Sequence, residues 1–206
     1  VEIAQQATDL GIRCVALFPN TPKNLKTPDC SESWNPNNLV NKATRAIKKV
    51  TPELGVMLDV ALDPYNSDGH DGLVRGSEIL NDETLITLER QAISHANAGA
   101  DILGPSDMMD GRVGVIRKAL ESKDYKNVLI MSYSAKFASS FYGPFRDAVG
   151  ATGTLSGDKK SYQIDCANLN EAIREAAMDV KEGADMILSL IHISEPTRQE
   201  AISYAV

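Results

Sequence analysis

The stretch NVLIMSYSAKF, residues 127–137, joins a short apolar run to a polar segment that carries a lysine near its end. The run NVLIM (127–131) is continuous rather than alternating, which is typical of a strand buried on both faces of a parallel sheet. Parallel sheets gather their sites at the carboxyl ends of their strands. The stretch therefore bears on both the fold class and a candidate reactive residue, Lys136.

Further runs of the same kind predict a repeated strand–helix unit. They are CVALF (14–18), GVMLDVAL (55–62), ADILG (100–104) and ADMIL (184–188). Amphipathic stretches between them predict helices over 37–50, 81–99, 111–122 and 168–183, and residues 1–12 are typical of a helix that runs into a loop. Gly99 and Gly183 stand where a helix ends before the next strand. Such units indicate an α/β protein, either a (β/α)8 TIM barrel or a doubly wound sheet.

Polar residues follow several of the strands, and this favours the barrel. About five βα units cannot close a barrel of eight, so we expect an incomplete, internal portion of one. A start at Val1, within a predicted helix and without a methionine, leads us to expect a cut N-terminus.

Composition excludes several function classes. The chain has 206 residues, 43% hydrophobic and 24% charged, with a net charge of -7, so nothing favours nucleic acid or an anionic membrane as a partner. No apolar run approaches the roughly 20 residues that span a bilayer, and we expect no signal peptide. Cys14, Cys30 and Cys166 lack CxxC spacing, which indicates reduced thiols and no zinc cysteine site.

Lys136 is a candidate nucleophile. A free lysine has a pKa of about 10.4 and is protonated. Desolvation at the mouth of a buried strand is expected to lower that pKa, so that the amine can attack a ketone and form a Schiff base. The alternative is an ordinary lysine in a surface loop.

Two further polar stretches follow strands. DVALDPYNSDGHDG (59–72) holds Asp59, Asp63, Asp68 and Asp71 beside His70, which suits a divalent cation or acid–base chemistry, but also a turn-rich loop. GPSDMMDGRV (104–113) includes Ser106, Asp107, Asp110 and Arg112, at a loop that also suits a helix N-terminus. We interpret Met108 and Met109 as packing residues and His95 as a residue on a helix face.

These three stretches, with ALFPNTPKNLKTPDCSESWNPNNL (16–39), resemble the porphobilinogen synthase (5-aminolevulinate dehydratase) family, in the family's order, from Val1 to about Ile187. The resemblance implies a (β/α)8 barrel that condenses two 5-aminolevulinate molecules into porphobilinogen, with loss of water, in tetrapyrrole biosynthesis. It also implies a homo-octamer, located in the bacterial cytoplasm or the plastid stroma.

The resemblance assigns roles to residues. It makes Lys136 one of two Schiff-base lysines and Arg146, in GPFRD, the clamp for a substrate carboxylate. It places Phe145, Lys159 and Gln163 beside the substrate. The remaining catalytic candidates are Asp59, Asp63, Asp71, Ser106 and Asp107.

The resemblance also bears on metals. Zinc-dependent members carry cysteines where this chain has Ala61, Asp63 and Asp71, and carboxylates favour magnesium over zinc. Asp63 and Asp71 are therefore candidate ligands of an active-site metal. Glu175 is the expected ligand of an allosteric Mg²⁺ at a subunit interface.

The C-terminal stretch departs from the family, whose second Schiff-base lysine would fall at position 190, where this chain has Leu190. Residues 188–206 resemble translated sequencing-adaptor DNA, although a divergent loop is the alternative. We accordingly expect a partial barrel over 1–187, a non-native tail over 188–206, and no site at His192, Glu195 or Arg198.

Loss of the second lysine predicts that the chain has little or no synthase activity. Two alternatives remain open: a non-catalytic subunit that assembles with intact chains, and a class I aldolase-like enzyme that uses Lys136 alone.

Overall fold

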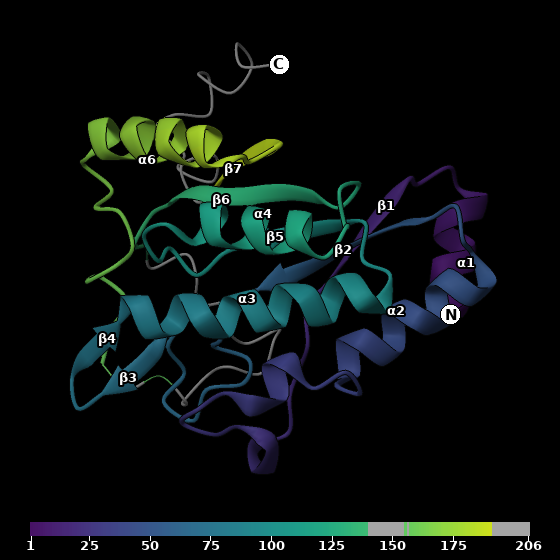
Figure 1. Cartoon of the computed structure of the whole chain (residues 1–206), viewed down its shortest axis with the longest axis horizontal. Coiled ribbons are helices and arrows are strands. Elements are labelled where there is room, and N and C mark those ends of the chain that lie inside the picture. Colours follow the sequence, from purple (N-terminus) through teal and green to yellow (C-terminus); the bar gives the residue numbers. More distant parts are fainter. Residues whose placement is uncertain (140–154, 156, 191–206) are drawn as a thin grey trace.

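The computed structural model describes residues 1–139, 155 and 157–190 (Figure 1). Its main sheet has five parallel strands: β1 (Cys14–Leu17), β2 (Gly55–Val60), β5 (Ile102–Pro105), β6 (Leu129–Lys136) and β7 (Met186–Leu190). They pair in the order β1-β2-β5-β6-β7, which is their order in the chain. A doubly wound sheet reverses its strand order part-way. The sequential order is that of a barrel wall, so the prediction of a partial (β/α)8 barrel is confirmed.

The helices match the predicted amphipathic stretches. They are α1 (Glu2–Asp9), α2 (Leu39–Val50), α3 (Asn81–Ala98), α4 (Arg112–Ser122) and α6 (Leu169–Glu182). The predicted start of α2 was two residues early because Asn38 is its cap, where the side chain accepts the N–H of Asn41 at 2.9 Å. Consecutive helices α2, α3, α4 and α6 pack side by side, as the strands do. Within the described residues, no helix is long and apolar enough to cross a bilayer.

Four short elements were not predicted from the sequence. Two 3-10 turns, η1 (Lys23–Leu25) and η2 (Ser31–Trp34), precede α2, and an antiparallel hairpin of β3 (Leu73–Arg75) and β4 (Glu78–Leu80) precedes α3. Gly76 turns the hairpin with a φ of 65°. Each of these elements has only three or four residues, too few to show a periodic pattern.

The core lies between the sheet and the helices. Alternate residues of β2, namely Val56, Leu58 and Val60, are completely buried in it. Side chains alternate along a strand, so Asp59 faces the opposite side, the interior of the barrel. Helix residues that close the core include Leu88, Ala92, Ile116 and Leu120.

The helix-to-strand junctions before β5 and β7 are built alike. Gly99 and Gly183 end α3 and α6 with φ values of 98° and 107°, and an Ala-Asp pair follows each glycine. Asp101 accepts the N–H of Val56 at 2.7 Å, and its ion-pair partner is Lys48 of α2 at 2.6 Å.

Asp185 forms the same arrangement between β6 and β7. It accepts the N–H of Ile130 at 2.8 Å and pairs with Arg117 of α4. At both junctions the carboxylate therefore fixes the register of the new strand against the strand before it.

Candidate active site

A β-bulge determines where Lys136 points. In the pairing of β6 with β7, Tyr133 lies opposite Leu188 but Ala135 lies opposite Ser189, so Ser134 is an extra residue. In a regular strand of the same sequence, Lys136 would face the same side as Ser132, whose side chain contacts residues of α4 and α6. One inserted residue moves the following side chains to the other face of the strand. The bulge thus turns Lys136 toward the barrel interior, where Asp59 also lies.

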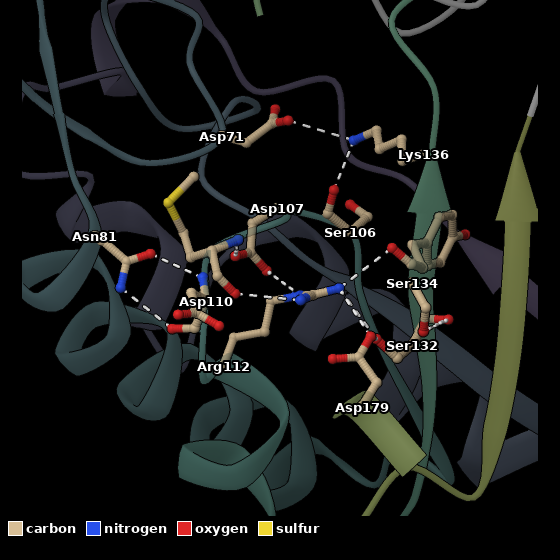
Figure 2. Close-up of polar contacts among 12 residues, drawn as sticks. Asp71, Asn81, Ser106, Asp107, Asp110, Arg112, Ser132, Ser134, Lys136 and Asp179 are labelled. Atoms are coloured by element: carbon tan, nitrogen blue, oxygen red, sulfur yellow. Dashed lines mark hydrogen bonds and ion pairs between the residues drawn. The ribbon is translucent and has the colours of Figure 1, made fainter. Parts of the chain in front are cut away.

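Lys136 is the last residue of β6, and its side chain is buried. The ammonium donates to the backbone carbonyl of Ser106 at 2.6 Å and lies 3.3 Å from Oδ2 of Asp71 (Figure 2). The strand extends beyond the apolar run 127–131 and ends at Lys136, as the sequence predicted.

The expected lowering of the lysine pKa is wrong for this arrangement. Burial acts in the predicted direction, but the carboxylates of Asp71, Asp63 and Asp59 outweigh it and raise the pKa of Lys136 above its ordinary value. Lys136 is therefore held as a cation among carboxylates.

Asp71 joins two lysines. Its completely buried carboxylate accepts from Lys136 and, through the other oxygen, from Lys159 at 2.5 Å. Burial alone would raise the pKa of Asp71, but the two ammonium groups bring it below its ordinary value. Lys159 also lies 3.5 Å from Oδ2 of Asp63, whose pKa is raised by burial despite that ammonium.

Asp59 differs from Asp71 because it forms no ion pair within the part of the chain that the structure describes. Its Oδ1 is buried and has no hydrogen-bond partner among the described residues. Burial, with a contribution from the charge of Asp63, raises the pKa of Asp59 to about 7. Asp59 can therefore hold or release a proton near neutral pH.

The predicted pair Ser106 and Asp107 separates into two roles. Ser106 contributes its backbone carbonyl to Lys136. The buried carboxylate of Asp107 instead accepts the N–H of Met109 at 2.8 Å and lies 3.6 Å from Nε of Arg112. Burial raises the pKa of Asp107 to about 6, although Arg112 opposes the shift.

Arg112 forms a buried cluster beside the site (Figure 2). Its guanidinium donates to Ser132 Oγ at 3.1 Å and lies 3.4 Å from Asp179 of α6. The cluster ties α4 and α6 to β6 below the lysine.

Sequence reasoning did not assign Tyr162 to the site, and it named His70 only as a member of the stretch 59–72. The hydroxyl of Tyr162 lies 3.1 Å from Nδ1 of His70 and accepts the N–H of Asp71 at 3.4 Å. Tyr162 is 92 residues from His70 and 91 residues from Asp71, so no local pattern in the sequence indicates these contacts.

The remaining predicted site residues include Gln163, which the structure describes, and Arg146 and Phe145, which it does not. Gln163 is buried and its backbone N–H bonds to the carbonyl of Lys159 at 3.0 Å. Arg146 and Phe145 lie outside the described residues, as do His192, Glu195 and Arg198. Leu190 is the register partner of Lys136 on β7, so both side chains share one face of the sheet.

His95 lies on a helix face, as expected, but that face is the core. It is completely buried, and its Nδ1 lies 2.8 Å from Oδ1 of Asn41. Burial lowers the pKa of His95 to about 4, so the ring is neutral. One turn earlier, Gln91 donates to the carbonyl of Ala61 at 3.2 Å and thereby supports the end of β2.

The residues at Asp63 and Asp71 do not fit a resident metal ion. The ammonium of Lys159 lies between the two carboxylates, where an ion would have to bind. Across the described parts of the chain, no three His, Cys, Asp or Glu side chains are grouped to hold a metal. We therefore derive no chemical step through a metal at this position.

Glu175 of α6 lies apart from Lys136, near other acids. Burial, followed by the charges of Asp110 and Asp179, raises the pKa of Glu175. A cation would relieve this repulsion, and Mg²⁺ is commonly held by one or two carboxylates with water.

Comparison with known proteins identifies the family. The family model for delta-aminolevulinic acid dehydratase matches residues 1–190. The chain belongs to the delta-aminolevulinic acid dehydratase family. The delta-aminolevulinic acid dehydratase of Bradyrhizobium diazoefficiens is 56% identical over 188 residues, which are 91% of this chain and 53% of that protein. The chloroplastic delta-aminolevulinic acid dehydratase of Glycine max is 51% identical over 189 residues, 91% of this chain and 46% of that protein.

Solved structures agree with the family and the fold. The Toxoplasma gondii delta-aminolevulinic acid dehydratase (porphobilinogen synthase), determined in complex with the reaction product porphobilinogen, matches with a TM-score of 0.89 and 45% identity over 92% of this chain and 55% of that chain. A 2,3-dimethylmalate lyase matches with a TM-score of 0.51 at 10% identity over 99% of this chain and 58% of its own, a likeness of fold alone. The chain thus spans about half the length of the dehydratases it matches.

Proposed function

We propose that this chain binds 5-aminolevulinate through an imine at Lys136, the first covalent step of a delta-aminolevulinic acid dehydratase. The observation that carries the proposal is a buried amine at the carboxyl end of a barrel strand, 3.3 Å from Asp71. The family membership supports the substrate, since the Toxoplasma gondii relative is described with porphobilinogen as its reaction product.

The carboxylates around Lys136 suit imine formation. In the net step, the ammonium nitrogen bonds to the ketone carbon, and two of its hydrogens leave with the ketone oxygen as water. The nitrogen is cationic before and after, so the carboxylates that favour the ammonium ion also favour the iminium ion. Only the neutral amine between them is disfavoured.

The attacking amine must first lose a proton. Asp71 is the nearest carboxylate, but its pKa is low, which makes it a weak base. Asp59, with a pKa of about 7, is better suited to hold that proton and return it to the departing water. We assign Asp59 the acid–base role and Asp71 the electrostatic one.

The substrate carboxylate needs a cation within reach of Lys136. Lys159, fixed against Asp63 and Asp71, is the described group that meets this need. We assign it to the substrate carboxylate together with Arg146, with Gln163 and Phe145 as neighbours.

Condensation of two substrate molecules would require more than this site. The family resemblance assigns a second imine to position 190, where Leu190 lies beside Lys136 without an amine. We propose that the chain forms one imine and does not complete porphobilinogen. Mg²⁺ at Glu175 and a homo-oligomer belong to the same proposal, and bacterial and chloroplastic relatives support the cytoplasm or the plastid stroma as the location.

Reductive trapping tests the proposal. The chain is incubated with 5-aminolevulinate and borohydride, and peptides are examined by mass spectrometry for an adduct on Lys136. We expect one adduct per chain, none in Lys136→Met, and none on the exposed Lys126 as an internal control. Absence of an adduct on Lys136 would refute the proposal, and trapping of a sugar phosphate instead would favour the aldolase-like alternative.

A further inference from the structure

Tyr162 lies where residues 157–164 meet the aspartate-rich loop, residues 61–72, and the proposed chemistry gives it no role. Its hydroxyl contacts two consecutive loop residues, the ring of His70 at 3.1 Å and the backbone N–H of Asp71 at 3.4 Å. The rings of Tyr162 and His70 meet edge to face, with centroids 6.0 Å apart.

Lys159 and Tyr162 belong to one turn. The N–H groups of Tyr162 and Gln163 both donate to the carbonyl of Lys159, at 3.3 Å and 3.0 Å. The turn contacts the loop twice, through the hydroxyl of Tyr162 and through the ammonium of Lys159. A displacement of one contact therefore displaces the other.

The hydroxyl is suited to bridge its two partners. Burial, with the charge of Asp71, raises the pKa of Tyr162, so the phenol keeps its hydrogen. A neutral phenol accepts from the N–H of Asp71 and can donate to Nδ1 of His70 at the same time. Phenylalanine would keep the ring and lose both bonds.

We propose that Tyr162 is a positioning residue, which bridges His70 and Asp71 and so holds the ammonium of Lys159 between Asp63 and Asp71. The bridging role rests on the contacts of Tyr162 and Lys159 with the loop alone. The consequence for substrate rests on the proposed function, because it requires Lys159 to receive the carboxylate of 5-aminolevulinate.

The first experiment needs no substrate. Wild type, Tyr162→Phe and the matched control Tyr125→Phe are labelled with acetic anhydride, and each lysine is followed by mass spectrometry. Tyr125 makes a comparable hydroxyl contact, to Asn97, but precedes β6 at the opposite end of the strand from Lys136. In Tyr162→Phe, Lys159 should be labelled at least about three to ten times faster, because one neutral hydrogen bond alone corresponds to that range and two are lost. An unchanged rate at Lys159 would overturn the inference.

The second experiment measures borohydride trapping against 5-aminolevulinate concentration. Tyr162→Phe should raise the half-saturating concentration by about tenfold and leave the limiting adduct on Lys136 unchanged. A lower limiting adduct at an unchanged half-saturating concentration would contradict a positioning role.

The two proposals fail separately. If wild type traps no substrate while Lys159 labelling still responds to Tyr162→Phe, the proposed function is refuted and the bridging role stands. Thermal melting checks that the variants fold. Should Tyr162→Phe unfold, His70→Gln changes the other partner of the hydroxyl and is expected to increase Lys159 labelling in the same way.

Discussion

At the scale of single residues, the site depends on which carboxylates carry a counter-charge. Asp71 has two ammonium partners and a lowered pKa, whereas Asp59 has a buried oxygen that no described residue hydrogen-bonds and a pKa of about 7. Asp59 lies within the apolar run 55–62, and Asp71 lies in the loop that follows it. Their different chemistry arises from Lys136 and Lys159, because both pair with Asp71 and neither forms an ion pair with Asp59 in the described part of the chain.

We predict that Asp59→Asn stabilises the fold at alkaline pH. Because the folded state raises the pKa of Asp59 from 3.8 to about 7, this residue favours folding less as pH rises across that interval. At about pH 8 the free energy of unfolding of the variant should exceed that of wild type by about 4 kcal/mol, with little difference at about pH 4. Urea denaturation at both values measures this.

Asp124→Asn is the control, since Asp124 is exposed and its ion-pair partner, Lys126, is exposed as well. A wild type more stable than Asp59→Asn at alkaline pH would contradict the assignment.

Sequence reasoning named Lys136, Asp71 and Ser106 as site candidates, but it did not predict the contacts between them. The apolar run followed by polar residues was sufficient to place a lysine at a strand end. The direction of its pKa was not predictable, because that depends on three carboxylates brought together by folding. The pairing of Lys159 with Asp71, 88 residues apart, likewise leaves no mark in local spacing.

At the scale of elements, helices and strands followed from periodicity, while the bulge at Ser134 did not. The bulge leaves one residue of β6 without a partner on β7, and no pattern in the sequence marks it. It nevertheless determines whether Lys136 faces the helices or the barrel interior. The hairpin of β3 and β4 was not predicted either, because strands of three residues are too short to show a hydrophobic pattern.

The repeated junction predicts a graded loss of stability. Asp101→Asn keeps an acceptor for the N–H of Val56 and loses the ion pair with Lys48, whereas Asp101→Ala loses both. We expect about 0.5 kcal/mol for the first and about 2 kcal/mol for the second, by urea denaturation. Equal losses would mean that the charge, and not the hydrogen bond, fixes β5 against β2.

At the scale of the whole molecule, sequential parallel pairing brings distant residues to one face. Lys136 and Leu190 are 54 positions apart and become direct neighbours on β6 and β7. The fold class was predictable from the repeated units, and the strand order decided between its two forms. Which residues meet across neighbouring strands required the register.

Leu190→Lys should supply a second amine beside Lys136. We expect two trapped 5-aminolevulinate molecules per chain instead of one, measured as the mass shift of the intact protein. Two neighbouring ammonium groups lower each other's pKa, so the adduct on Lys136 should also form faster. Leu190→Met is the uncharged control. A single adduct in Leu190→Lys, equal to wild type, would refute a second amine site on this face.

The two junction carboxylates have a consequence for how the chain folds as it is made. Asp101 reaches back to Lys48 and Val56, and Asp185 reaches back to Arg117 and Ile130. Every one of these partners is earlier in the chain. Each new strand can therefore lock onto the preceding one as it leaves the ribosome, and neither junction requires residues still to be synthesised.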